Sequence, residues 1–114
     1  MLFSTAKKCV VGLVSRVKDS SSLDGMNFDL IINATSAGLN SNLSPINNSI
    51  YKNNKNFSVC YDMSYRKETP FIREARQRDV MVYDGLGMLI EQAAASFFIW
   101  HKIKPTTNNI ASKL

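Results

Sequence analysis

Gly85 and Gln92 combine two properties that suit a ligand-binding surface. They are seven residues apart in a mostly apolar segment, which corresponds to about two turns of an α-helix, so they share one helix face. Glycine lets a ligand approach the backbone, and a glutamine amide can both donate and accept hydrogen bonds. Free N–H groups of Gly85 and Gly87 at the helix start would also favour an anion. We therefore interpret this segment as one wall of a binding site.

The same segment contains the only G-x-G sequence of the chain, Gly85-Leu86-Gly87. In a dinucleotide-binding motif a third glycine would follow, but Ile90 occupies that position. The sequence is therefore a weak indication of a dinucleotide site. A plain strand-to-helix turn is an equally good interpretation.

The titratable side chains assign no acid, base or nucleophile. His101 is the single histidine, and its position at a predicted helix end favours a C-terminal cap. Asp62 and Asp84 each follow an apolar segment, so they could form a carboxylate pair or equally accept hydrogen bonds from loops. Tyr61 and Tyr65 flank Asp62, and we expect one of these tyrosines in a pocket or both in ordinary packing.

The two cysteines, Cys9 and Cys60, are distant in sequence and fit no metal or redox pattern. We expect free buried thiols and no metal site.

Three apolar segments that alternate with helical patterns would position these residues. They predict strands over residues 28–34, 57–63 and 80–83. The first segment is almost continuously apolar, which is typical of a parallel strand buried on both faces. The rhythm of strand and helix predicts right-handed βαβ units and a parallel sheet.

Four helical segments are expected around this sheet. The first begins at about Ser4. The second is one short helical turn within residues 39–56, which are otherwise loop. Another begins with Thr69 at the cap and Pro70 at the first helical position. The long segment 84–100 predicts a glycine-containing turn followed by a helix buried on several sides.

Length and charge restrict the class of protein. The chain has 114 residues, enough for one domain, and a net charge of +5. Its basic residues are scattered and no aromatic residues interleave with them, so we expect no nucleic-acid site, whereas an anionic small molecule fits the basic balance. It contains no run of eighteen apolar residues and no signal-peptide pattern, so we expect a cytoplasmic protein without a membrane anchor.

Four blocks of the sequence, in order and spacing, resemble the shikimate dehydrogenase family. They are Asp29 to Leu39 (DLIINATSAGL), Cys60 to Tyr65 (CYDMSY) with Thr69-Pro70-Phe71, Asp84 to Ala94 (DGLGMLIEQAA), and Trp100-His101 with Pro105. The resemblance implies an α/β fold, a partial Rossmann-like parallel sheet with flanking helices, over residues 1–105. Residues 106–114 would form a C-terminal helix or tail. It further implies that the N-terminal substrate domain and the first βαβ glycine-rich unit lie outside this chain.

The resemblance also implies roles for five residues. Met63 and Gly85 correspond to family positions that touch the nicotinamide end of NADP, and Thr35 belongs to a loop that lines the cofactor cleft. Tyr65 and Gln92 correspond to positions that bind the hydroxyls or carboxylate of shikimate.

By the same resemblance, the reaction would be the NADP-dependent interconversion of 3-dehydroshikimate and shikimate, in aromatic amino-acid biosynthesis. The lysine and aspartate that transfer protons in the family have no counterpart here, so we expect no catalytic residue in this chain and no activity of the isolated chain. A separate N-terminal half is the expected protein partner. Two alternatives stay open, a non-catalytic nucleotide- or protein-binding module and a relative that acts on quinate.

Overall fold

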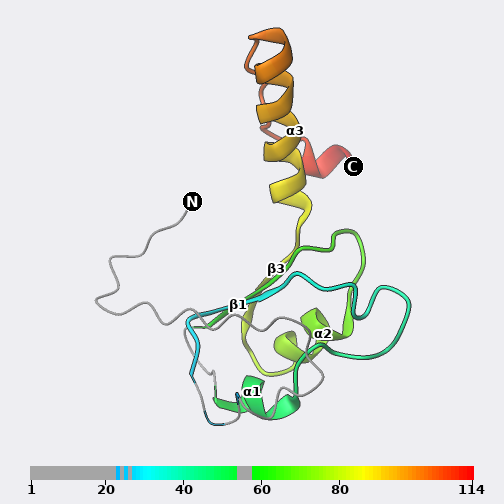
Figure 1. The fold of residues 1–114 in the computed structure, drawn as a ribbon, viewed down its shortest axis with the longest axis vertical. Coiled ribbons are helices and arrows are strands. Elements are labelled where there is room, and N and C mark those ends of the chain that lie inside the picture. The colour runs from blue at the N-terminus through cyan, green and yellow to red at the C-terminus, as the bar shows by residue number, and fades with distance from the viewer. Residues whose placement is uncertain (1–22, 24, 26, 54–57) are drawn as a thin grey trace.

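The computed structural model describes residues 23, 25, 27–53 and 58–114. The predicted helix from Ser4 and the first cysteine, Cys9, lie outside these residues. The elements of the described part are, in order, β1 (Leu30–Asn33), α1 (Asn48–Asn53), β2 (Val59–Asp62), α2 (Pro70–Arg76), β3 (Met81–Tyr83), α3 (Leu86–His101) and the 3-10 turn η2 (Ala111–Lys113) (Figure 1).

The three strands form one parallel sheet in the order β1-β2-β3. Leu30 pairs with Val59, which pairs with Met81 on its other side. Each crossover contains a helix, α1 between the first two strands and α2 between the last two. The predicted parallel sheet and its strand-and-helix rhythm are therefore confirmed.

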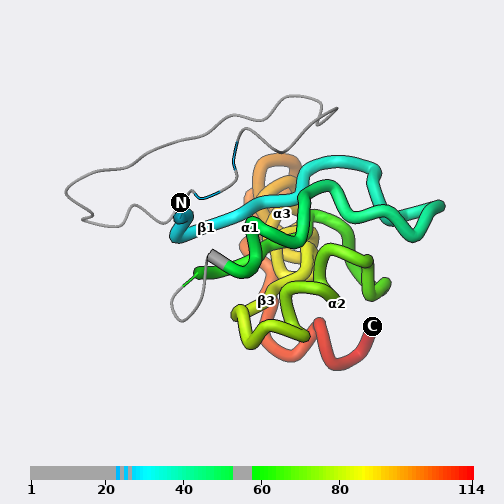
Figure 2. The backbone as a smooth tube through the Cα atoms, turned by 90° about the horizontal axis from the view of Figure 1, so that it is seen from below, coloured from blue at the N-terminus to red at the C-terminus, as the bar shows by residue number. Residues whose placement is uncertain are grey.

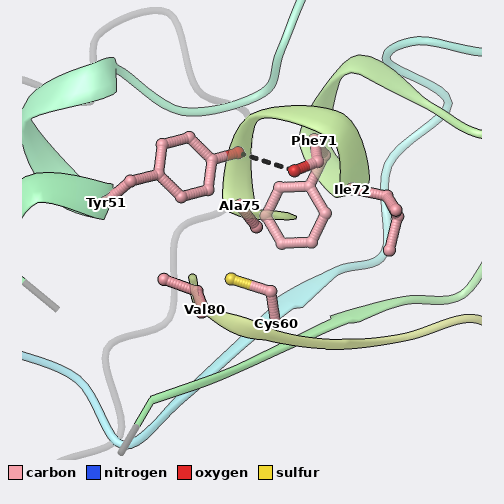
Figure 3. Close-up of a cluster of buried hydrophobic side chains, with 6 residues drawn as sticks. All are labelled: Tyr51, Cys60, Phe71, Ile72, Ala75 and Val80. Carbon is pink, nitrogen blue, oxygen red and sulfur yellow. Dashed lines mark hydrogen bonds between the residues drawn. The ribbon is translucent and has the colours of Figure 1, made fainter. Parts of the chain in front are cut away.

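The hydrophobic core lies on one face of the sheet, beneath α1 and α2. Figure 3 shows Tyr51 of α1 and Phe71 of α2 meeting above Cys60 of β2. All three side chains are fully buried, and the two rings lie 6.0 Å apart between centroids. The Tyr51 hydroxyl donates a hydrogen bond to the Phe71 carbonyl oxygen (3.3 Å), which joins the two helices. The short helical turn expected within residues 39–56 thus supplies a central core residue.

The start of α2 agrees with its sequence signals. The side chain of Thr69 accepts a hydrogen bond from the N–H of Ile72 (3.4 Å), and Pro70 occupies the first turn. A cap of this kind satisfies one of the N–H groups that the first helical turn leaves without a partner.

The opposite face of the sheet is exposed, so the prediction that the first strand is buried on both faces is wrong. Leu30 and Ile32 of β1 are 53% and 55% exposed, and Met81 and Tyr83 of β3 are 57% and 53% exposed. Successive side chains of a strand point to opposite faces. α2 contacts β2 and β3 from the core side, and α1 packs on α2 and adds Tyr51 to the same core, so among the described residues the other face has no helix to cover it.

The prediction that the long apolar helix is buried on several sides is also wrong. α3 has no buried residue, and Ile99 and Trp100 are 63% and 74% exposed. Figure 1 shows α3 projecting away from the sheet, and Figure 2 views the same helix end-on. The C-terminal segment returns along α3, and Arg66 donates a hydrogen bond to the carbonyl oxygen of Leu114 (2.6 Å).

The C-terminus of α3 is capped by a different residue from the one expected. Lys102 adopts a left-handed conformation (φ 58°), and its N–H bonds to the Phe98 carbonyl oxygen (2.8 Å). His101 is the last helical residue, and its ring lies 4.4 Å from that of Phe97. Within the described part of the chain, no helix has the length and apolar character needed to cross a membrane.

Candidate functional site

A shallow cavity of about 320 Å³, wide open to solvent, lies at the carboxyl ends of β1 and β2. Parallel α/β sheets bind their ligands at this edge. The loop after each strand forms one wall, and the lining residues are Ala34, Thr35, Leu39, Met63, Ser64 and Tyr65. The structure therefore brings three of the five predicted site residues, Thr35, Met63 and Tyr65, into one cavity.

The wall after β1 is shaped by side chain to backbone hydrogen bonds. The N–H and the hydroxyl of Thr35 both donate to Oδ1 of Asn33, at 3.0 and 2.7 Å. The Thr35 hydroxyl also accepts from the N–H of Ala37 (3.2 Å). Because its hydroxyl is used within the loop, Thr35 gives this wall its shape.

The wall after β2 carries two large side chains, Met63 and Tyr65. Met63 and Tyr65 are 42% and 45% exposed. The N–H of Met63 bonds to the Asn33 carbonyl oxygen (3.0 Å), so the ladder between the strands extends one residue into the wall. Three lining residues carry a hydroxyl group, and Tyr65 has the longest side chain of the three. Its half-exposed phenol can therefore reach a ligand in the cavity.

Gly85 lies directly behind the Met63 wall. It is buried, precedes the first residue of α3, and donates from its N–H to the Ser64 carbonyl oxygen (2.9 Å). A β-carbon at this position would lie 2.7 Å from the Met63 carbonyl carbon, so only glycine permits this approach. Gly85 therefore supports the cavity wall by close packing.

The start of α3 offers fewer free N–H groups to an anion than the sequence suggested. The N–H of Gly85 already bonds to Ser64, and the N–H of Leu86 bonds to the Asp84 carboxylate (3.1 Å). Of the two N–H groups expected to attract an anion, those of Gly85 and Gly87, the first thus has a protein acceptor.

The two aspartates do not form a carboxylate pair. Asp84 accepts the bond from Leu86 at the surface, while Asp62 is 1% exposed and accepts from Asn33 and from the N–H of Ser64. The other interpretation, in which each aspartate accepts hydrogen bonds from a loop, is correct for both. Among the described residues no group of histidine, cysteine, aspartate and glutamate could hold a metal ion.

Gln92 lies on α3, where its side chain is exposed, and it does not line the cavity. The prediction that it shares a helix face with Gly85 follows from their spacing, but the structure does not bring the amide to Tyr65 and Thr35.

Cys60 is a free thiol inside the core, as predicted. Burial raises its pKa to about 12, which leaves almost no thiolate at neutral pH. This cysteine is therefore excluded as a nucleophile.

The sequence pointed to Thr69 as a helix cap and to the loop that begins at Asn33, but it did not reveal that both side chains donate hydrogen bonds to Asp62. Asn33 pairs with Asp62 across β1 and β2, and both are buried. The available signal was a polar residue at the end of each apolar strand.

Known proteins resemble the chain at the level of sequence and of fold. The sequence profile of the Shikimate 5'-dehydrogenase C-terminal domain matches residues 85–110. The shikimate dehydrogenase (NADP(+)) of Colwellia psychrerythraea is 49% identical over 94 residues, which cover 81% of this chain and 33% of that protein.

The chain also superposes on solved structures. The Ael1 enzyme from Pseudomonas putida superposes with a TM-score of 0.71 at 36% identity, covering 83% of this chain and 35% of that one. The shikimate 5-dehydrogenase from Thermus thermophilus, in complex with NADP(H) and shikimate, superposes with a TM-score of 0.62 at 30% identity, covering 74% and 32%. The chain spans about a third of the length of these relatives. In sequence it is similar to the C-terminal part of shikimate dehydrogenases, and in fold to a shikimate 5-dehydrogenase.

Proposed function

We propose that this chain supplies the C-terminal part of an NADP-dependent shikimate dehydrogenase, which interconverts 3-dehydroshikimate and shikimate. One observation carries the proposal. Two loops that lie far apart in sequence, one with Thr35 and the other with Met63 and Tyr65, line one cavity at the carboxyl edge of the sheet. The similarity to the Colwellia psychrerythraea enzyme supports the same conclusion.

The cavity fits the nicotinamide end of NADP better than its phosphates. None of its six lining residues is charged, and Ala34, Leu39 and Met63 provide apolar surface. A flat, weakly polar ring can pack against this surface, whereas the lining side chains offer a phosphate no positive charge. When bound, NADP supplies the hydride chemistry. In this proposal Met63 and the Thr35 loop orient its nicotinamide end, and Gly85 holds Met63 in place.

Two side chains are proposed to bind the substrate. The half-exposed phenol of Tyr65 would hydrogen-bond a ring hydroxyl or the carboxylate. Gln92 is exposed on α3, so its amide is available where this helix meets the rest of the enzyme. The net charge of +5 also suits an anionic substrate.

In this proposal the chain binds and orients the cofactor and the substrate, but it does not supply the group that transfers the proton. The lining residues include no histidine, lysine or carboxylate. Loss of a general acid typically costs ~10²–10⁴-fold in rate, so the isolated chain should be close to inactive. A polypeptide equivalent to the N-terminal two-thirds of the relatives would provide that group. We further propose that residues 1–105 form the partial Rossmann-like domain, that residues 106–114 form a C-terminal helix or tail, and that the enzyme is cytoplasmic.

A chimaera tests this function. This chain would replace the matched C-terminal third of the Colwellia psychrerythraea enzyme, and NADP-dependent oxidation of shikimate would be measured beside that of quinate. We expect activity in the chimaera and background rates for the isolated chain. The matched variant Tyr65→Phe, which loses only the hydroxyl, should raise the KM for shikimate about tenfold.

Two outcomes would contradict the proposal. One is a folded chimaera that binds NADPH without turnover, which would favour a non-catalytic binding module. The other is turnover by the isolated chain at a rate close to that of the full-length relative.

A further inference from the structure

The buried carboxylate of Asp62 connects the two walls of the cavity. Its Oδ1 accepts from the N–H of Ser64 (2.9 Å), which lies in the wall after β2. Its Oδ2 accepts from Nδ2 of Asn33 (3.2 Å) and from the hydroxyl of Thr69. Asn33 is the last residue of β1, directly before the first wall. All three donors are therefore satisfied by one side chain that is 1% exposed.

These bonds extend to a residue that lines the cavity. Asn33 uses its Nδ2 for Asp62 and its Oδ1 for the N–H and hydroxyl of Thr35 (3.0 and 2.7 Å). Asn33 is itself 3% exposed, so water does not compete for these bonds.

The third donor, Thr69, connects the same carboxylate to α2. Its hydroxyl donates to Asp62 and accepts from the N–H of Ile72. Thr69 is fully buried. The position of the carboxylate is thus fixed by the start of a helix that packs in the core.

The chemistry of a carboxylate explains why an aspartate suits this position. An ionised carboxylate only accepts hydrogen bonds, so it holds the Asn33 amide with Nδ2 toward Asp62 and Oδ1 toward Thr35. The flipped amide would place an oxygen against the carboxylate and an NH₂ group against the Thr35 N–H. We infer that Asp62 is a positioning residue, which sets the Thr35 and Ser64 walls of the cavity through Asn33 and Thr69. Its effect on cofactor and substrate rests on the proposed function.

Hydrogen exchange on the full chain tests this inference without cofactor or turnover. Asp62→Asn should raise the exchange rates of the Thr35 and Ser64 amides about tenfold. The Lys102 amide, bonded at the far end of α3, serves as the internal reference. The matched control Asp84→Asn removes a surface carboxylate whose bond goes to Leu86, and it should leave the Thr35 amide unchanged.

A second pair of variants decides the question if Asp62→Asn does not fold. Thr69→Val removes the hydroxyl at nearly constant volume, and Thr69→Ser retains it. We expect faster exchange at Thr35 in the valine variant and the wild-type rate in the serine variant. A Thr35 amide that exchanges at the wild-type rate in every folded variant would overturn the inference.

The chimaera then gives the kinetic result. Asp62→Asn should raise the KM for NADP about tenfold with a smaller change in kcat, and Asp84→Asn should not. An unchanged KM with altered exchange would also overturn the positioning role. A wild-type chimaera without activity would instead contradict the proposed function, while the exchange rates would still decide whether Asp62 holds the walls.

Discussion

Gly85 packs against the main chain of Met63 so closely that a β-carbon on the glycine would overlap the Met63 carbonyl oxygen. The contact joins the start of α3 to the loop that lines the cavity. The obstacle is backbone, which cannot rotate away as a flexible side chain can. Gly85 therefore fixes how α3 leaves the sheet, and it also fixes one wall of the cavity.

Gly85→Ala should destabilise the chain and disturb the cavity. Overpacking against rigid neighbours typically costs about 1–3 kcal/mol, and urea unfolding would measure the loss. Gly87→Ala is the matched control, because a β-carbon there meets nothing within 4 Å and lies in a helix. Alanine in a helix is favoured over glycine by roughly 0.5–1 kcal/mol, so this variant should be slightly more stable than wild type. Equal stability of the two variants would contradict the close-packing argument.

Local signals predicted the elements well, because those signals act between neighbouring residues. The cap at Thr69 and the proline after it depend only on the first turn of α2. The strand segments were recognised from apolar runs, and all three strands lie within the predicted ranges.

Burial was predicted poorly, because an apolar side chain does not specify what covers it. The sequence of β1 suits a strand covered on both faces, yet Leu30 and Ile32 are exposed where the described residues place no second layer. The hydrogen bond between Asn33 and Asp62 could not be predicted from the sequence either. These residues are 29 positions apart, and only the strand register makes them neighbours.

The core and the projecting helix should respond differently to truncation. Phe71 of α2 is fully buried beside Tyr51 of α1, so Phe71→Ala should cost about 3–5 kcal/mol through lost contacts and a cavity. Ile99 is apolar too, but it is 63% exposed on α3, and Ile99→Ala should change stability by less than about 0.5 kcal/mol. The free energy of unfolding of both variants, measured in urea, would test the assignment. A large loss in the Ile99 variant would mean that α3 is packed in solution.

The stability of the chain should fall in alkaline solution, because two core groups keep their protons in the folded state. Burial raises the pKa of Cys60 from 9.0 to about 12, and burial is also the main cause that raises the pKa of Tyr51 above its ordinary 10.0. The unfolded chain loses these protons at lower pH than the native chain does. Each group therefore stabilises the fold fully below its unfolded pKa, and this contribution declines by about 1.4 kcal/mol per pH unit above it.

Tyr51→Phe isolates one of these groups. At pH 8 it removes the bonds to the Phe71 carbonyl and to Ser44, so wild type should be the more stable protein. Above pH 10 the advantage of wild type should shrink, because phenylalanine has no proton to lose. Unfolding free energies of both proteins between pH 8 and pH 11 would give this difference directly. A difference that stays constant with pH would contradict the role of burial.

Trp100 offers a direct measurement of whether α3 is covered by another polypeptide. It is the only tryptophan of the chain, and it is 74% exposed near the end of the helix. In the isolated chain we expect emission typical of solvated indole, with strong quenching by acrylamide. If the N-terminal two-thirds of the Colwellia psychrerythraea enzyme docks on α3, the emission should shift to shorter wavelength and the quenching should weaken, because the indole leaves water. The variant Trp100→Phe provides the blank, since it removes the emission and keeps an aromatic ring. Unchanged emission of the chain at saturating concentrations of that polypeptide would show that the complementary part does not cover this end of α3.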